Sequence, residues 1–507
     1  MSFSRITNTK RNMIWSYIEY IVTFLFAFIS RTVIVNFLGS EYLGLSSLFT
    51  SVLHVLNVAE SGFAVAVTYN MYKPLAENDE KTVCALLAFY RKIYTIIGSV
   101  VLTAGLIVMP FIPYVIKGDY PQDINIYLLY LIFLVNTSVS YFLFSYKTSL
   151  LNALQRLDLT KIAYSIVSIF QSLLQILVIV VFKNYYLFAL VMIGGTISKN
   201  LFAAYISKKK FPQYFCSGEL NPEIKRNIAS KVKGLLVCNI SSVTYTTFDS
   251  IVISALSGLV LVAVYNNYLT IYGTVTNIVL LIRTAMQASV GNSVAKESRE
   301  KNYKDVKKWQ FMFSMVAMFC STCLLCLYQP VMRLWMGENR LLPDRDVVLL
   351  SVLFYVSAIQ HAYFLYLNAA GLWLRLRWAY ISSALLNLVL NFVLGRLFNT
   401  TGIIIATLTA TVFSGLIWQA IVIFKYYFQV SPVNYYLKQL AFFLLAIVSG
   451  VISLFISNIA NLNGIINIVF RGAVCLLVSA SLVLIFFSRT EVFRDCLKIA
   501  KAMIKRK

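Results

Sequence analysis

Long apolar segments recur along the whole chain, and they restrict its fold more than any other feature. Each is about 20 residues or longer, and as a helix at ~1.5 Å per residue it would cross the ~30 Å hydrocarbon core of a bilayer. Only short loops remain between the segments. The sequence therefore predicts an all-α polytopic membrane protein with about 14 transmembrane helices. The segments cover residues 14–37, 43–69, 84–112, 124–146, 161–182, 185–206, 234–257, 259–291, 309–330, 347–370, 376–398, 401–424, 437–457 and 465–487.

The composition agrees with this expectation. Apolar residues make up 59% of the chain and charged residues 13%, with a mean hydropathy of +0.76. Soluble domains contain about 25% charged residues. The first apolar segment is too long for a signal peptide and has no small-residue cleavage site, so we expect it to remain as a helix.

The net charge of +24 comes from 44 Lys and Arg against 20 Asp and Glu. Most of the basic residues lie in every second loop, whereas the alternate loops contain few of them. This distribution follows the positive-inside rule and predicts that both termini are cytoplasmic. The charge is thus explained by membrane topology, and we expect no nucleic-acid partner.

A weak internal repeat predicts the domain organisation. Residues 31–39 and 249–257 align at an offset of 218, together with the turns that follow them. Two six-helix lobes in the same membrane orientation are typical of transporters that rock one lobe against the other. The predicted parts are an N-terminal lobe at 1–207, a cytoplasmic linker with an amphipathic helix at 208–233, a C-terminal lobe at 234–430, an extra helix pair at 431–487 and a basic amphipathic cytoplasmic tail at 488–507.

The basic tail has an apolar side and a basic side, so we expect it to form a helix on anionic membrane lipid. The alternative is a simple anchor of basic residues after the last span.

A charge inside an apolar segment costs about 2.5–3.5 kcal/mol and normally faces a bundle interior or an aqueous cavity, and we single out four of the charged residues in such segments. They are Arg31, Glu60, Asp249 and Arg283. Our hypothesis is that they form two gates in a substrate path. Arg31 and Asp249 would pair at the outer side, and Glu60 and Arg283 at the inner side. The alternative is that each charge pairs permanently within its own lobe.

Polar residues at helical spacing predict the walls of this path. Asn266, Thr270 and Asn277 share one face of the helix at 259–291, and Arg283 lies off that face by roughly 100°. We expect a polar cavity lined by His54, Asn57, Asn266, Thr270, Asn277, His361 and Asn368.

The sequence contains no catalytic set. We find neither a glycine-rich phosphate loop followed by Lys, nor paired carboxylates in one loop, nor a Ser/His/Asp arrangement. Cys320, Cys323 and Cys326 lie in an apolar helix without a neighbouring His or carboxylate, so we interpret them as packing residues. We therefore expect a protein that is not an enzyme and that uses no metal and no cofactor.

Three short stretches carry a resemblance to a known family. They are Leu38-Gly-Ser-Glu-Tyr-Leu-Gly44, the turn at 69–79, and Leu150-Leu-Asn-Ala-Leu-Gln-Arg156. Together with the helix layout they make the chain similar to Wzx-type flippases, the polysaccharide-export branch of the multidrug/oligosaccharidyl-lipid/polysaccharide (MOP) exporter superfamily. The resemblance covers essentially the whole chain.

This resemblance implies a substrate and a location. The substrate would be a polyprenyl-diphosphate-linked oligosaccharide, moved by alternating access from the inner to the outer leaflet of a bacterial cytoplasmic membrane for O-antigen, capsule or exopolysaccharide. Partners would include membrane lipid, H⁺ or Na⁺ as a coupling ion, and polysaccharide polymerase machinery. Arg31 and Arg283 fit the cationic cavity of the family, whereas Glu60 and Asp249 balance them.

Two other functions remain open at this point. An ion-coupled multidrug or cation antiporter of the same superfamily would also have two six-helix lobes, although it needs only twelve helices and a smaller, more acidic site. A lipid II flippase would share nearly every feature seen in the sequence.

Overall fold

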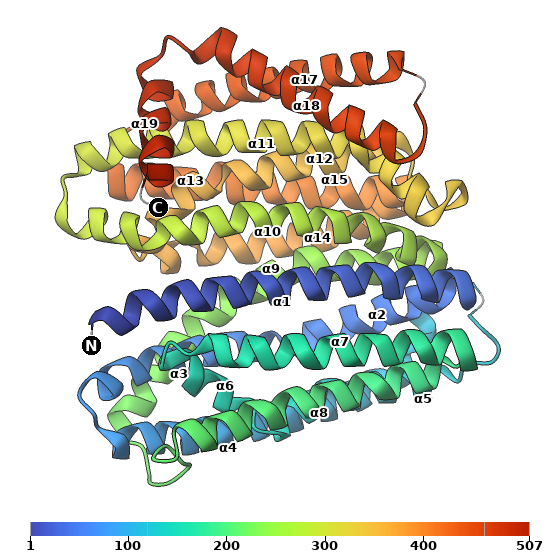
Figure 1. Ribbon diagram of the computed structural model, residues 1–507, viewed down its shortest axis with the longest axis vertical. Coiled ribbons are helices and arrows are strands. Elements are labelled where there is room, and N and C mark those ends of the chain that lie inside the picture. The colour runs from blue at the N-terminus through green and yellow to red at the C-terminus, as the bar shows by residue number, and fades with distance from the viewer. Residues whose placement is uncertain (1, 119, 461, 506–507) are drawn as a thin grey trace. The chain divides into compact units, whose positions relative to one another are not determined.

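The computed structural model describes residues 2–118, 120–460 and 462–505 (Figure 1). The side chains of some helical stretches in these ranges, among them 58–62 and 230–246, lie outside the description. Every regular element in the described ranges is a helix, which confirms the predicted all-α class. The chain divides into two compact units, Met1–Ala263 and Val264–Lys507.

The first unit is built from nine α-helices and one 3₁₀ segment. Within it, α1 packs along α7, and α9 packs on α2 and α3 (Figure 1). The elements are α1 (Ser2–Phe37), α2 (Ser40–Leu56), α3 (Val58–Ala76), α4 (Glu80–Val108), η1 (Met109–Val115), α5 (Ile126–Phe142), α6 (Tyr146–Ala153), α7 (Leu157–Phe182), α8 (Tyr185–Lys210) and α9 (Pro222–Ser257).

The second unit begins within α10, and α11 is at its centre because it packs on α12, α17 and α18. Two of its segments, η4 and η5, are π-helical. The elements are α10 (Leu259–Lys296), α11 (Arg299–Met336), η2 (Glu338–Arg340), α12 (Asp344–Ile359), α13 (His361–Ala369), η3 (Leu372–Leu376), α14 (Arg377–Phe398), α15 (Thr400–Thr411), η4 (Val412–Gln419), α16 (Ala420–Ile423), η5 (Phe424–Phe428), α17 (Val433–Ile459), α18 (Gly464–Phe487) and α19 (Glu491–Lys505).

Eleven helices of the described ranges are long and apolar enough to span a membrane, and the pair α5–α6, bent by 50°, makes a twelfth span. Two predicted segments fall outside this number. Segment 43–69 is divided into α2 and α3 at Asn57, and within segment 234–257 only Thr247–Ser257 counts as an apolar helix. Both segments are helical, and the total of fourteen stays a prediction.

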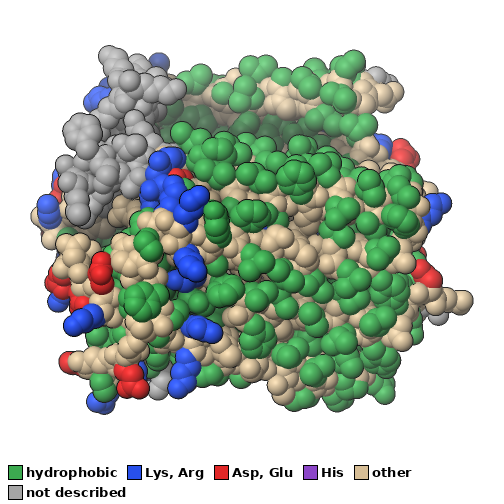
Figure 2. Space-filling model, turned by 60° about the horizontal axis from the view of Figure 1, so that its bottom comes forward, with side chains coloured by type: hydrophobic (Ala, Val, Ile, Leu, Met, Phe, Trp, Pro, Cys, Tyr) green, Lys and Arg blue, Asp and Glu red, His purple; other side chains and the backbone are tan. Residues whose placement is uncertain are grey.

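Besides the side chains that form its core, the chain exposes many large apolar side chains on its helices. Phe455 on α17 and Ile485 on α18 are each 72% exposed. On the visible face in Figure 2 hydrophobic side chains predominate, and Lys and Arg gather toward one side. In water such large apolar areas would be unfavourable, so this exterior fits a lipid environment.

The boundary between the compact units lies beyond α9, so this helix belongs to the same unit as the helices α2 and α3 on which it packs. On its described part, Thr247 Oγ1 lies 3.2 Å from Nδ1 of His54 on α2. The predicted lobe limits rest on the internal repeat, and they stay a prediction.

The basic tail forms α19, and its apolar side contacts the beginning of α11. The Phe493 and Phe311 rings meet edge-on with centroids 6.4 Å apart. Lys308 Nζ lies 3.2 Å from an Asp495 carboxylate oxygen and 3.4 Å from Asp305. The amphipathic helix expected from the sequence therefore has a protein contact on its described apolar side.

We expect Asp495→Asn to loosen α19 from α11. The hydrogen bond from Lys308 lowers the pKa of the Asp495 carboxyl below its usual 3.8. The contact is then fully present above the ordinary carboxyl pKa and is lost only as the pH falls through the lowered value. At neutral pH, amide hydrogen exchange in residues 491–505 should become about two- to fivefold faster in the variant. Asp305→Asn is the matched control because Asp305 pairs with Lys308 within α11; equal exchange in the two variants would contradict the docking role.

Candidate functional site

Between α12 and α13 the helical hydrogen-bond pattern is interrupted at the single residue Gln360, although the two helices together form one span, Asp344–Ala369. The π-helical segment η4 lies beside the break. Gln360 Nε2 donates to the Thr411 carbonyl at 3.4 Å, and Tyr363 Oη donates to the Gly415 carbonyl at 2.6 Å. π-Helical turns shift the backbone hydrogen-bond pattern and occur frequently at functional sites.

Gly415 explains why the two segments approach so closely. A Cβ atom at this position would overlap the side-chain amide of Gln360. Only glycine therefore leaves room for the Gln360 side chain to reach η4. The break and the π-helical turn are thus held together by one small residue and two side-chain hydrogen bonds.

The residue directly after the break, His361, meets Arg283 of α10. The Arg283 NH1 atom lies 3.2 Å from His361 Nδ1. Because a guanidinium can only donate hydrogen bonds, Nδ1 accepts and the His361 ring carries its proton on Nε2. The Arg283 guanidinium also lies 4.3 Å from the centroid of the Phe364 ring, one helical turn further along α13. The structure therefore brings together two of the predicted site residues.

Arg283 retains hydrogen-bonding capacity. Its Nε is buried and has no hydrogen-bond partner in the described part of the chain. A neutral imidazole and an aromatic face hold the cation without neutralising it. A guanidinium kept in this way can receive an anionic group, and carboxylates and phosphates match its fork of donors.

The predicted polar face of α10 is only partly covered within the second unit. Asn266 and Thr270 are half-buried and Asn277 is exposed, although they lie in a helix of apolar composition. Thr270 Oγ1 donates to the Asn266 carbonyl at 2.8 Å. Asn368, near the end of α13, is half-buried. These residues thus remain accessible from outside their own unit.

The remaining predicted site residues lie in the first unit. Arg31 is half-buried on α1, and Asp249 on α9 is 2% exposed; neither is without a partner. His54 is exposed and contacts Thr247, and Asn57 lies at the break between α2 and α3. The side chain of Glu60 lies outside the described residues. Arg31 and Asp249 consequently belong to one compact unit, and Arg283 belongs to the other.

The cysteines lie apart from this site. Among the described residues no group of three His, Cys, Asp or Glu side chains could hold a metal ion. Cys326 and Cys475 are free and buried, and Cys475 Sγ lies 3.8 Å from the Thr322 carbonyl, between α18 and α11.

The fold is that of MOP transporters. The chain superposes on the lipid II flippase MurJ in an inward closed conformation with a TM-score of 0.69 at 14% identity, and the match covers 94% of this chain and 99% of that one. A multidrug resistance MATE transporter in an inward-facing conformation matches with a TM-score of 0.62 at 15% identity, over 80% of this chain and 97% of that one. The Vibrio cholerae MATE transporter VcmN matches with a TM-score of 0.57 at 12% identity, over 83% and 98%. At these identities the likeness shows the fold alone.

The family of the chain follows from its sequence. Residues 9–287 match the polysaccharide biosynthesis protein family, and the chain belongs to this family. The comparison with curated proteins gives no significant match. The chain is thus a multi-pass membrane transporter of the Wzx-like, MOP type and not an enzyme, and the resemblance found in the sequence is confirmed.

Proposed function

We propose that this protein flips polyprenyl-diphosphate-linked oligosaccharide units from the inner to the outer leaflet of a bacterial cytoplasmic membrane, with both termini in the cytoplasm. The family match over residues 9–287 carries the proposal, because it links the chain to polysaccharide biosynthesis. The flippase MurJ supports it, since that match extends over 94% of this chain. The products would serve O-antigen, capsule or exopolysaccharide assembly, together with polymerase machinery.

Arg283 is the residue that we assign to the diphosphate of the substrate. It is a cation inside an apolar helix and has a donor without a partner in the described ranges. A diphosphate offers several acceptor oxygens, and Arg binds such groups through two parallel hydrogen bonds. His361 and Phe364 would hold the guanidinium ready before the substrate arrives.

The alternation of access is assigned to the four membrane charges. Arg31 and Asp249 would close the outer side, and Glu60 and Arg283 the inner side, each pair forming in one access state and separating in the other. H⁺ or Na⁺ is the proposed coupling ion, because the sequence contains no nucleotide-binding loop.

Charge reversal tests the outer pair. We expect Arg31→Asp to reduce transport by about tenfold or more, because it places two carboxylates together in a region of low dielectric constant. Adding Asp249→Arg should restore at least part of the activity, since the pair is re-formed with the charges exchanged. Transport is measured by export of lipid-linked sugars in cells that lack the native gene. A double variant that is no better than Arg31→Asp alone would exclude the pair.

A specific observation also favours a second function. Several MATE multidrug transporters share the fold with TM-scores of 0.53 to 0.62. An ion-coupled drug or cation antiporter is therefore the alternative. These matches cover 80–85% of the chain, less than the flippase match. Lipid II is a further candidate substrate, because MurJ is described as a lipid II flippase.

Mass spectrometry of polyprenyl-diphosphate-linked sugars distinguishes these functions. Cells with and without the protein are compared, and a membrane-impermeant probe reports the leaflet that holds the lipids. We expect complete oligosaccharide-lipid to accumulate on the inner leaflet when the protein is missing. Accumulation of lipid II instead would identify the peptidoglycan precursor as the substrate. Unchanged amounts and leaflets of both lipids would favour the antiporter.

A further inference from the structure

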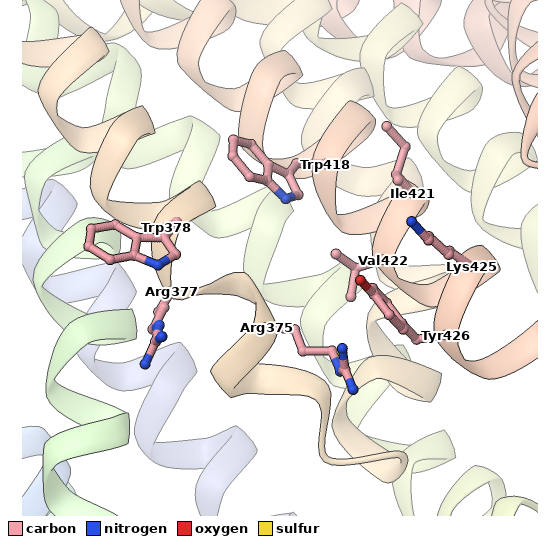
Figure 3. Close-up of a pocket in the computed structure, with 8 residues that line it drawn as sticks. All are labelled: Arg375, Arg377, Trp378, Trp418, Ile421, Val422, Lys425 and Tyr426. Carbon is pink, nitrogen blue, oxygen red and sulfur yellow. The ribbon is translucent and has the colours of Figure 1, made fainter.

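A pocket of about 370 Å³ opens among helix ends of the second unit, and none of its lining residues belongs to the Arg283 cluster (Figure 3). Its walls come from η3, from the first residues of α14, and from the segment η4–α16–η5. Three cations and three aromatic side chains line it: Arg375, Arg377, Lys425, Trp378, Trp418 and Tyr426. The volume lies within the range of ~300–1,000 Å³ that is usual for ligand pockets.

The three cations have no acidic partner. No carboxylate lines the pocket, and in the described part of the chain none of the ion pairs includes Arg375, Arg377 or Lys425. Each of them lies over an aromatic ring instead, and Arg377 lies 5.7 Å from the centroid of its neighbour Trp378. The Arg375 guanidinium lies 4.0 Å from the centroid of Tyr426, and Lys425 Nζ lies 5.6 Å from the same ring. Figure 3 shows Arg375 and Lys425 at this ring, with Arg377 and Trp378 across the opening. Such a gathering of like charges favours binding of an anion.

The position of the pocket indicates the depth of its ligand. Arg377 begins α14 and Phe428 ends η5, so the pocket lies where two membrane-spanning segments terminate. Trp and Tyr are enriched at this interfacial level, where lipid headgroups reside. Trp378 is 62% exposed and Ile421 is 41% exposed. A ligand in the pocket would therefore lie at the level of the lipid headgroups, next to the acyl chains of the bilayer.

From this geometry we infer that the pocket binds the phosphate of an anionic phospholipid headgroup, of the phosphatidylglycerol or cardiolipin class. Basic residues recognise the phosphate, and the exposed Trp378 and Ile421 contact the first part of the acyl chains. A zwitterionic headgroup would bring an ammonium group toward three cations, which disfavours it. The inference concerns residues to which the proposed function assigns no role, and it does not depend on the proposed transport activity.

Native mass spectrometry of the detergent-purified full chain tests this binding. The probes are phosphatidylglycerol and phosphatidylcholine with the same acyl chains. Each basic residue near a membrane surface contributes about 1 kcal/mol, or roughly fivefold, to binding of anionic lipid. We expect the double variant Arg375→Gln/Lys425→Gln to bind phosphatidylglycerol about 30-fold more weakly than the native chain. Arg375→Lys/Lys425→Arg, which keeps both charges, should retain most of the affinity.

The matched control is Lys209→Gln/Lys210→Gln on α8. It removes two exposed cations, one of them also 5.6 Å from a tyrosine ring, but neither lines this pocket. The control should bind phosphatidylglycerol as the native chain does. Equal binding of phosphatidylcholine, or undiminished binding by the pocket variant, would overturn the inference. Displacement of the lipid by millimolar inorganic phosphate would assign the pocket to free phosphate. A transport defect of the pocket variant in vesicles without anionic lipid would assign the pocket to the substrate diphosphate. Either result would also overturn the inference.

Discussion

Arg283→Ala should reduce transport of the lipid-linked substrate by about 100-fold or more, the largest effect that we expect from any single substitution in the path. Hydrogen bonds to charged groups contribute about 1.5–3 kcal/mol each, and two such bonds to the diphosphate account for this magnitude. Arg283→Lys keeps the charge but loses the planar fork, so we expect a smaller loss of about tenfold. The readout is the rate at which the lipid-linked oligosaccharide becomes accessible to a membrane-impermeant probe.

A control separates this role from folding. Arg396 is an exposed arginine at the end of α14, and Arg396→Ala removes the same group from the same unit without touching the site. We expect native transport from this variant. The amount of folded protein, measured by fluorescence-detected gel filtration, should be similar for both alanine variants. Normal transport by Arg283→Ala at a normal protein level would show that Arg283 does not bind the substrate.

The helices of this protein could be predicted from sequence because bilayer spans leave a strong local signal. Each predicted apolar segment coincides with helix, and the basic tail is the amphipathic helix α19. The interruptions at Asn57 and Gln360 were not predictable in the same way. Neither Asn57 nor Gln360 is accompanied by Pro or Gly, the residues that mark a helix break in a sequence. The Gln360 side chain also lies where a Cβ atom at position 415 would be, a close approach to a distant residue that the sequence does not reveal.

The sequence indicated which residues belong to the candidate site, but not which of them are in contact. Intramembrane charge marked Arg283, and a polar position in an apolar helix marked His361. Their contact joins α10 to α13, and the face of α10 on which Arg283 lies differs from that of its polar stripe.

The basic pocket left no signal of its own in the sequence. Arg375, Arg377 and Lys425 are typical residues for loops under the positive-inside rule, and about 50 residues of chain separate Lys425 from the other two. Only the antiparallel return of α15 through η5 brings them to one opening.

Asp158→Ala should release the beginning of α1 and lower the thermal stability of the whole chain. Asp158 is 1% exposed at the start of α7. Its Oδ2 atom lies 2.7 Å from Arg11 Nε, and its Oδ1 atom lies 3.1 Å from Arg156 Nε. Asn12 Oδ1 accepts from the Asp158 backbone N–H at 2.8 Å, so α1 is tied to this turn by two adjacent residues.

Removing the carboxylate leaves two guanidinium groups together without an anion. Fully buried ion pairs cost about 3–5 kcal/mol when one partner is removed. Because both arginines still reach water, we expect about 2–3 kcal/mol here, and a fall in unfolding temperature of about 5 °C in detergent. Glu77→Ala is the matched control, since it removes the carboxylate of an exposed pair, with Lys73 Nζ at 3.9 Å; such pairs contribute about 0.3–0.5 kcal/mol. Transport should fall as well, because α1 carries Arg31 and its position depends on this anchor. Equal unfolding temperatures for the two variants would show that α1 is held by its packing along α7 alone.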